Sequence, residues 1–363
     1  MGEYSFSDLH NLRAFESYVD FLLSRIRDSA DIVLAERFRR ARKKNTFRRR
    51  GGRGIAEIRA YILPSGVKVV SEARIPIQVS IVANPSVGLQ GEYAVLYLRL
   101  ASVGSEFGRT FIAAAKVPLR DLRGEVSVKA EPILYGITPY ECVEDPRVDP
   151  VRSDELYHVR AMYVSPKSCV VTFKSPLRDG KPEGIEAVHF ADGRGDTFLL
   201  RDFRDTFPLN EGFMTVRPYL RDYRLGGVFI GPRDGACVSF DELEAVPELL
   251  PTEGEDKTGG NVSLKLSSNE YLLLYHVVDM HGAYYTYAAL FDEDAELLAL
   301  TEEPVIAPNP GVYSGRRPAT VFVCGAIKHG DEILVTAGRD DEITIVYRIE
   351  EEKLHEKLMF LRG

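Results

Sequence analysis

Residues 91–100 read GEYAVLYLRL, a turn followed by an apolar run of strand length, and this pattern recurs along the chain. Four further copies read DELYHVRAMY (154–163), NEGFMTVRPYL (210–220), NEYLLLYHVV (269–278) and GDEILVTAG (330–338). When the copies are aligned on Tyr93, Tyr157, Phe213, Tyr271 and Ile333, the steps between them are 64, 56, 58 and 62 residues. Each interval is long enough for one four-stranded sheet with its loops. The repeat predicts an all-β fold, a five-bladed β-propeller.

Evenly spaced hairpins in a sandwich fold would give a similar pattern, so a second criterion is needed. In a propeller the inner strands of all blades face one axis, and polar residues at matching positions should converge there. The repeat contains such polar residues within or beside apolar strands: Arg99, Arg160, Arg217, His276 and Asp340. A buried charge without a partner is costly, so their recurrence favours a shared polar pocket over five separate strand ends that reach solvent.

The first 54 residues differ from the rest of the chain. From Ser7 to about Lys44 apolar residues recur at helical spacing, and a dense basic block, RFRRARKKNTFRRRGGR, runs from Arg37 to Arg53. We therefore expect a helical, basic N-terminal extension over 1–54 and the propeller over 55–363. For the basic block, a solvated loop or a contact between subunits of a homo-oligomer is favoured over a nucleic-acid contact.

Composition narrows the functional class. The 363-residue chain has a net charge of −8, which argues against a nucleic-acid binder. No apolar run is long enough for a membrane span, and the N-terminus lacks a signal-peptide pattern, so a cytoplasmic protein is expected. The four cysteines are scattered and are expected to be buried free thiols, and the histidines lack the spacing of metal ligands.

Several motifs resemble a known enzyme family. The stretches VANPSVGLQGEYAVLYLR (82–99), ECVEDPRV (141–148), YLLLYHVVD (271–279) and the FP…VRP arrangement (207–218) are similar to glycoside hydrolase family 130. That family contains β-mannoside phosphorylases and β-mannosidases that are five-bladed propellers. The likeness runs from about residue 80 to 350, and it implies that residues 55–363 form a catalytic domain.

The resemblance also implies roles for individual residues. Asp145 would be the general acid, protonating the glycosidic oxygen through a sugar hydroxyl. The implied substrate-binding residues are Asn84, Arg99, Arg147 and Asp340, and the implied phosphate-binding residues are Arg217, Lys257 and His276. No cofactor or metal is implied, and inorganic phosphate would be a co-substrate. Pro146 is expected to bias Asp145 toward an extended backbone.

These assignments agree with the chemistry of inversion. Cleavage with inversion needs a proton donor on one face of the sugar and a nucleophile on the other. Phosphate arrives as an anion, so the protein must supply cations and not a second carboxylate. We expect an enzyme that cleaves β-mannosides or related glycosides, by phosphorolysis to mannose 1-phosphate in preference to hydrolysis. The alternative is an inactive sugar-binding or scaffold propeller whose arginine-rich segment recruits a partner.

Overall fold

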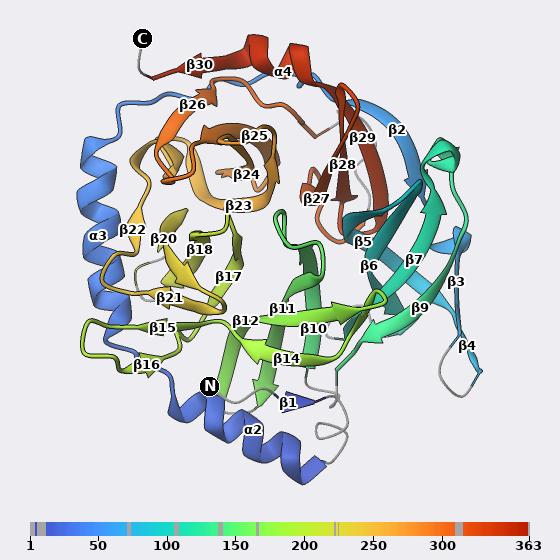
Figure 1. The fold of residues 1–363 in the computed structure, drawn as a ribbon, viewed down its shortest axis with the longest axis horizontal. Helices are drawn as coiled ribbons and strands as arrows, with labels where there is room; N and C mark the ends of the chain where they lie inside the picture. Colours follow the sequence, from blue (N-terminus) through green and yellow to red (C-terminus); the bar gives the residue numbers. More distant parts are fainter. Residues whose placement is uncertain are drawn as a thin grey trace.

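The computed structural model describes residues 4–5, 12–70, 74–104, 109–136, 141–164, 167–220, 223, 225–308 and 315–361. Within these ranges the chain is mostly β-structure with few helices. Five β-sheets surround a common centre, and the first strand of each lies nearest that centre (Figure 1). Contacts join β27 to β5, β5 to β10, β17 to β23 and β23 to β27, so the inner strands adjoin one another. The predicted all-β, propeller-like fold is confirmed.

The sheets are named here in chain order, with their strands given from the centre outward. The first contains β5 (Val79–Gln90), β6 (Tyr93–Ser102), β7 (Thr110–Pro118), β9 (Val128–Leu134), β3 (Val67–Val70) and β4 (Pro76–Ile77). The second contains β10 (Glu141–Val148), β11 (Glu155–Val164), β12 (Lys167–Arg178), β14 (Gly184–Ala187) and β1 (Tyr4–Ser5), with β13 (Lys181–Pro182) beside β12.

The third sheet contains β17 (Phe203–Pro208), β18 (Phe213–Leu220), β20 (Phe229–Asp234), β21 (Cys237–Ser239), β15 (His189–Ala191) and β16 (Thr197–Phe198), with β19 (Leu225–Gly226) and β22 (Glu244–Ala245) beside it. The fourth contains β23 (Glu255–Lys265), β24 (Tyr271–Asp279), β25 (Tyr284–Phe291), β26 (Leu297–Thr301) and β30 (Leu358–Phe360). The fifth contains β27 (Val321–His329), β28 (Glu332–Arg339), β29 (Ile343–Glu350), β2 (Glu57–Ile62) and β8 (Gly124–Glu125).

The sheets are not five equal units. In the first, second, fourth and fifth, the three inner strands follow one another in the chain and pair antiparallel. The inner strands of the third sheet, β17, β18 and β20, also pair antiparallel, with the short β19 between the last two. Its outer part differs, because β21 pairs with β15, which precedes β17 in the chain. The fifth is completed by β2 from the N-terminal part, in which Tyr61 pairs with Ile345 of β29. This pairing of early and late segments closes the ring.

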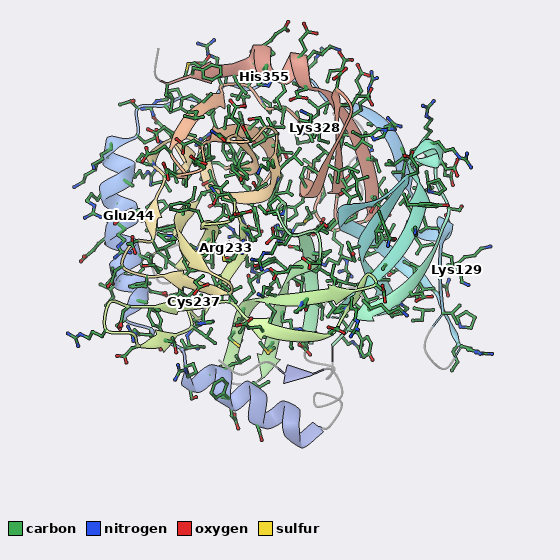
Figure 2. All side chains as sticks on the ribbon, viewed as in Figure 1. Lys129, Arg233, Cys237, Glu244, Lys328 and His355 are labelled. Atoms are coloured by element: carbon green, nitrogen blue, oxygen red, sulfur yellow. The ribbon has the colours of Figure 1, made fainter. Side chains whose placement is uncertain are left out.

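Helices lie at the periphery (Figure 1). The α-helices are α2 (Leu12–Ser24), α3 (Ala30–Lys44) and α4 (Glu351–Lys357), and short 3-10 turns span Pro64–Gly66, Leu119–Asp121 and Pro247–Leu249. Helix α3 lies along the third sheet. Its Arg37 donates to the carbonyls of Phe240 and Leu243, and its Arg40 forms an ion pair with Glu244, which Figure 2 labels beside the helix.

The part of the basic block that follows α3 lies partly inside the molecule. The side chain of Arg49 is 1% exposed, and its guanidinium contacts both carboxylate oxygens of Glu255 at 2.9 and 2.7 Å. It also donates to the carbonyls of Glu248 and Leu250. The segment therefore straps the third sheet to the fourth; the expectation of a solvated loop does not hold for Arg49.

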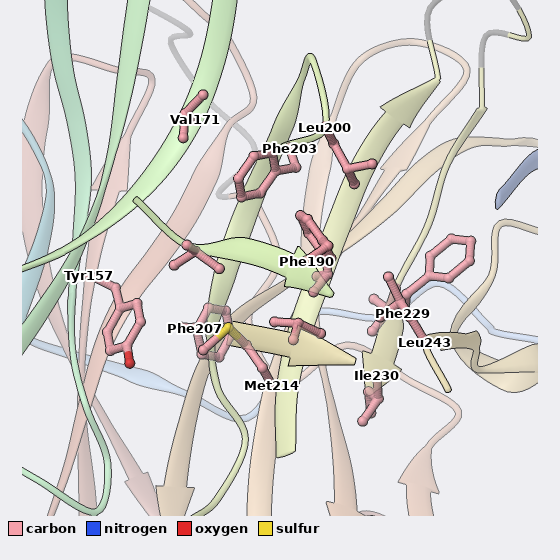
Figure 3. Packing of buried hydrophobic residues seen from close by; sticks show 14 of the residues in the cluster. Tyr157, Val171, Phe190, Leu200, Phe203, Phe207, Met214, Phe229, Ile230 and Leu243 are labelled. Carbon is pink, nitrogen blue, oxygen red and sulfur yellow. The ribbon is translucent and has the colours of Figure 1, made fainter. Parts of the chain in front are cut away.

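The hydrophobic core lies between the sheets. Around the third sheet, Phe190, Phe203 and Phe207 are buried together (Figure 3), and the rings of Phe190 and Phe203 meet edge to face at 5.3 Å. The four cysteines are free thiols, of which Cys142, Cys169 and Cys324 are buried. No helix in the described part of the chain is long and apolar enough to cross a membrane.

Candidate active site

The innermost strand of every sheet carries an extra residue at the same place. The antiparallel register shifts between Ala83 and Ser86, Glu144 and Arg147, Arg204 and Phe207, Gly260 and Val262, and Val323 and Gly325. Within these bulges lie Asn84, Asp145, Asp205, Asn261 and Cys324, which are 61, 60, 56 and 63 residues apart. A bulge bends its strand and changes the direction of a side chain. Five equivalent bulges therefore meet at the centre, including that of the irregular third sheet.

Three of these residues have a left-handed backbone. The φ angles are 45° at Asn84, 50° at Asp145 and 47° at Asp205. Asn and Asp tolerate this region better than other non-glycine residues because their short polar side chains bond locally. The expectation that Pro146 would hold Asp145 extended is therefore wrong. The bulge sets the conformation and places Asp145 against the neighbouring sheet.

Asp145 is buried and held by two donors from the first sheet. Its Oδ1 accepts hydrogen bonds from Asn84 Nδ2 at 2.8 Å and from Arg99 Nη1 at 3.0 Å. Arg99 also contacts Glu144 at 3.3 Å, and burial opposes its charge while Glu144 and Asp145 raise the pKa of Arg99 well above its ordinary value. The structure thus brings Asn84, Arg99 and Asp145 together.

Arg147 links three bulges through the three nitrogens of its guanidinium group. Nε donates to the carbonyl of Asn261 at 2.6 Å, Nη1 to the carbonyl of Asp145 at 3.1 Å, and Nη2 to Asp205 Oδ1 at 2.7 Å. The residue is 2% exposed. Its guanidinium is therefore engaged by the protein itself, and it fixes the second, third and fourth sheets relative to one another.

Asp205 connects Arg147 to Arg217. Its second oxygen, Oδ2, accepts from Nε of Arg217 on β18, so one buried carboxylate bridges two guanidinium groups. Burial alone would raise the pKa of Asp205, but Arg217 and Arg147 outweigh it and lower the pKa below its usual range. Sequence reasoning missed Asp205. The signal was its spacing of 60 residues from Asp145.

His276 on β24 lies beside this cluster. Its Nδ1 is 2.7 Å from Oδ1 of Asn261, a residue that the sequence analysis also missed. Burial lowers the pKa of His276 to about 3; Asp205 opposes this shift, whereas Arg217, Lys257 and Arg147 reinforce it. The imidazole is consequently neutral at physiological pH, and the positive charge around it comes from arginine and lysine.

Two glycines show how closely these groups approach. A Cβ atom at Gly259 would lie 2.5 Å from His276 Cε1, 2.6 Å from Arg217 Cδ and 2.8 Å from Asp205 Oδ2. At Gly226 it would lie 3.4 Å from Lys257 Cβ and 3.9 Å from Arg217 Nη1. Arg217, Lys257 and His276, the expected phosphate-binding residues, thus border one another.

Two residues expected at the centre have other partners. Arg160 forms a separate buried ion pair with Glu141 and also donates to His158, so its expected convergence with the others is not seen. Asp340 accepts from the amide of Thr320 at 3.2 Å and contacts Arg339 at 3.4 Å. The end of the strand before it lies against the first bulge, where a Cβ at Gly338 would be 2.0 Å from Asn84 Oδ1.

The arrangement places a carboxyl group and a cationic group in one connected network. Asp145 lies at one end, Arg217 and Lys257 lie at the other, and Arg147 and Asp205 join them. No group of His, Cys, Asp and Glu side chains that could hold a metal ion occurs among the residues that the structure describes. The residues present can donate a proton and bind an anion.

The C-terminal part of the chain is similar to a known enzyme family. Residues 243–359 match the family model of glycoside hydrolase family 130, described as β-1,4-mannooligosaccharide phosphorylase. No curated protein is significantly similar to the chain.

Solved structures share the fold. The β-1,2-mannobiose phosphorylase of Listeria innocua superposes with a TM-score of 0.59 at 18% identity, covering 77% of this chain and 92% of that one. MPT-4, a mannose phosphorylase of Leishmania mexicana in complex with phosphate, gives 0.53 at 15% identity, with 85% and 92% covered.

A further structure belongs to a study of the GH130 family of mannoside phosphorylases, which contains hydrolases of β-1,2 linkages in Candida mannan; it gives 0.52 at 13% identity, with 85% and 94% covered. At these identities the likeness shows the fold alone, whereas the family-model match is one of sequence. Together they confirm the resemblance of this chain to glycoside hydrolase family 130, a family of mannoside phosphorylases and glycoside hydrolases.

Proposed function

We propose that this protein is an inverting glycoside phosphorylase that cleaves β-mannosides and releases mannose 1-phosphate. The observation that carries the proposal is the connected network from Asn84 and Asp145 through Arg147 and Asp205 to Arg217. It supplies one carboxyl group for the leaving oxygen and a separate cationic site for the nucleophile, which is what inversion by an anionic nucleophile requires.

In this proposal Asp145 is the general acid. Its proton passes to the glycosidic oxygen through a sugar hydroxyl, while Asn84, Arg99 and Asp340 hold the sugar. Arg147 is engaged by protein atoms, so we assign it the positioning of the bulges in place of direct substrate contact. An oxygen of phosphate attacks the anomeric carbon, the glycosidic bond breaks, and no second carboxylate is needed as a base.

The cationic site is formed by Arg217 and Lys257, with His276 as a neutral neighbour. A guanidinium holds phosphate oxygens through charge-assisted hydrogen bonds, and the ammonium adds a second charge. We also propose that all five sheets act as blades of one catalytic domain over 55–363, to which the extension over 1–54 is strapped by Arg49. Inorganic phosphate is the only co-substrate.

The test is turnover of β-1,4- and β-1,2-mannobiose with and without phosphate. Phosphate-dependent release of mannose 1-phosphate is expected from the wild type, with a loss of about 10²- to 10⁴-fold in Asp145→Asn. Asp154→Asn, at an exposed turn, serves as the matched control. Release of free mannose independent of phosphate would instead identify a hydrolase, and absence of turnover on both disaccharides would count against an enzyme for these linkages.

A further inference from the structure

The family resemblance implies that His276 binds phosphate, although its imidazole is neutral in the structure. An imidazole that binds an anion by attraction must be protonated, yet His276 is 1% exposed and lies beside Arg217 and Lys257. Its ring is also enclosed by aromatic neighbours, with centroids 5.5 Å from Tyr284 and 5.2 Å from Phe322. Burial and adjacent cations both disfavour the imidazolium, in agreement with the lowered pKa of His276.

A neutral imidazole has one donor and one acceptor nitrogen, and Asn261 determines which is which. Asn261 is fully buried at the fourth bulge, and its carbonyl is fixed by Nε of Arg147 at 2.6 Å. Its Oδ1 lies 2.7 Å from His276 Nδ1. An amide oxygen can only accept, so Nδ1 carries the proton and Nε2 carries a lone pair.

The surrounding charges favour the same tautomer. Cε1 of the ring, the atom between Nδ1 and Nε2, faces Gly259 together with Arg217 Cδ and Asp205 Oδ2. Both oxygens of Asp205 already accept from Arg147 and Arg217, so neither requires a proton from the ring. With Nδ1 donating to Asn261, an unprotonated Nε2 keeps the ring neutral beside the buried cation Arg217, whereas a second N–H would add a like charge there.

We propose that His276 selects the anion: its Nε2 accepts a hydrogen bond from a protonated oxyanion, hydrogen phosphate or arsenate, and Asn261 is the positioning residue that holds this tautomer. The inference rests on the proposed phosphorolysis and specifies its co-substrate. Sulfate has the same shape and charge as hydrogen phosphate but carries no proton at neutral pH, so it would leave Nε2 facing an oxygen lone pair. A site built to bind a hydroxyl rejects the analogue that lacks it.

The reaction balances with this arrangement. One unprotonated phosphate oxygen forms the new bond to the anomeric carbon as the glycosidic bond breaks, and the proton of Asp145 goes to the leaving oxygen. The P–OH group remains on a non-bridging oxygen of the product and keeps its hydrogen bond to Nε2. His276 thus contributes recognition and neither gains nor loses a proton.

Two measurements on the full-length protein test the inference. Binding of phosphate and of sulfate is compared by calorimetry, and the ¹⁵N shifts of the His276 ring are recorded at pH 7, assigned by their loss in His276→Gln. We expect sulfate to bind at least about 100-fold more weakly than phosphate. We also expect a protonated Nδ1 and an unprotonated Nε2.

Asn261→Leu removes the acceptor for Nδ1, so the ring should populate both tautomers and the preference for phosphate should fall to within about tenfold. Ser263→Ala removes another buried hydrogen bond of β23, to the carbonyl of Leu209, and should change neither readout.

Equal binding of the two anions, or a proton on Nε2, would overturn the inference while phosphorolysis stands. If phosphate does not bind at all, the proposed function fails and the inference fails with it. The wild-type measurements decide the matter even if Asn261→Leu does not fold.

Discussion

Asn84 donates a hydrogen bond from Nδ2 to Oδ1 of Asp145 at 2.8 Å, so the bulge of the first sheet holds the bulge of the second. Both residues have a left-handed backbone, with φ of 45° and 50°. Arg99 Nη1 donates to the same oxygen at 3.0 Å. The two donors from the first sheet thus reach the same oxygen, Oδ1.

The first prediction concerns this hydrogen bond. In Asn84→Ala the carboxyl group of Asp145 loses one of its two side-chain donors, and its orientation is less restricted. Because a hydrogen bond to a charged group contributes about 1.5–3 kcal/mol, we expect kcat to fall by roughly 10- to 100-fold. Steady-state kinetics on a mannobiose would measure it, with Asn269→Ala in an exposed turn as the control. An unchanged kcat would show that Arg99 alone orients the acid.

Asp205 is the site of the second prediction. Asp205→Asn leaves Arg147 and Arg217 buried without their shared counter-charge, and breaking such a buried pair costs about 3–5 kcal/mol. We expect that loss in the free energy of unfolding from urea titration, together with a higher KM for phosphate because Arg217 loses its anchor. Asp192→Asn breaks the partly exposed pair with Arg27 and should cost less than about 1 kcal/mol. Similar losses in the two variants would contradict the role of Asp205 as the shared buried counter-charge of Arg147 and Arg217.

Much of the architecture follows from period and spacing, because apolar strands repeat at regular intervals wherever sheets share a centre. Arg99, Arg217 and His276 lie in that repeat, Asp145 was expected from the family resemblance, and the structure brings all four into one network. Asp205 and Asn261 escaped prediction because they lie before the strands used to align the repeat, and only their spacing of 60 and then 56 residues after Asp145 marks them. Arg160 shows the opposite failure. Arg99 and Arg217 pair with the last residue before their bulges, but Arg160 lies one position further along its strand and forms a separate ion pair with Glu141.

The N-terminal part illustrates a second limit. Apolar spacing indicates the helices. Neither the pairing of β2 with β29 nor the ion pair between Arg49 and Glu255 can be inferred from composition. A run of arginines looks the same whether each side chain is solvated or, like Arg49, inserted between sheets. Only the position of Glu255, about 200 residues later in the chain, decides between these outcomes.

The third prediction concerns Arg49 and its ion pair with Glu255. Arg49→Ala removes a buried ion pair, so that Glu255 loses its counter-charge and the carbonyl of Glu248 loses the guanidinium donor. We therefore expect a loss of about 3–5 kcal/mol in the free energy of unfolding. Arg48→Ala, at the exposed neighbouring position, should change it by less than about 0.5 kcal/mol. Chemical denaturation of both variants measures the difference. Equal effects would mean that Arg49 is dispensable.

Gly259 gives the fourth prediction. In Gly259→Ala the new methyl group would lie within 2.8 Å of His276, Arg217 and Asp205, so these groups must move apart. Overpacking of this kind costs about 1–3 kcal/mol, and we expect KM for phosphate to rise more than KM for the sugar. Gly88→Ala is the matched control, since its methyl group would meet only ordinary contacts at 3.8 and 3.9 Å to Val148.

The fifth prediction concerns pH. The pKa of His276 is lowered to about 3, chiefly by burial, whereas an unfolded histidine has a pKa of about 6.5. Between these values the unfolded chain binds a proton that the folded protein does not, so acidification favours unfolding. The stability from this group is fully present above pH 6.5 and is lost as the pH falls, by about 1.4 kcal/mol per pH unit.

Urea titrations between pH 7.5 and 5.5 would measure this dependence. His158, whose pKa is also well below its ordinary value because of burial and Arg160, contributes in the same direction, so the test is a comparison of slopes. His276→Gln should have a shallower decline than the wild type, whereas His281→Gln, at an exposed position, should keep the wild-type slope. If His276→Gln retained the full decline, the pKa of His276 would be the same in the folded and unfolded protein, which would contradict the buried neutral imidazole.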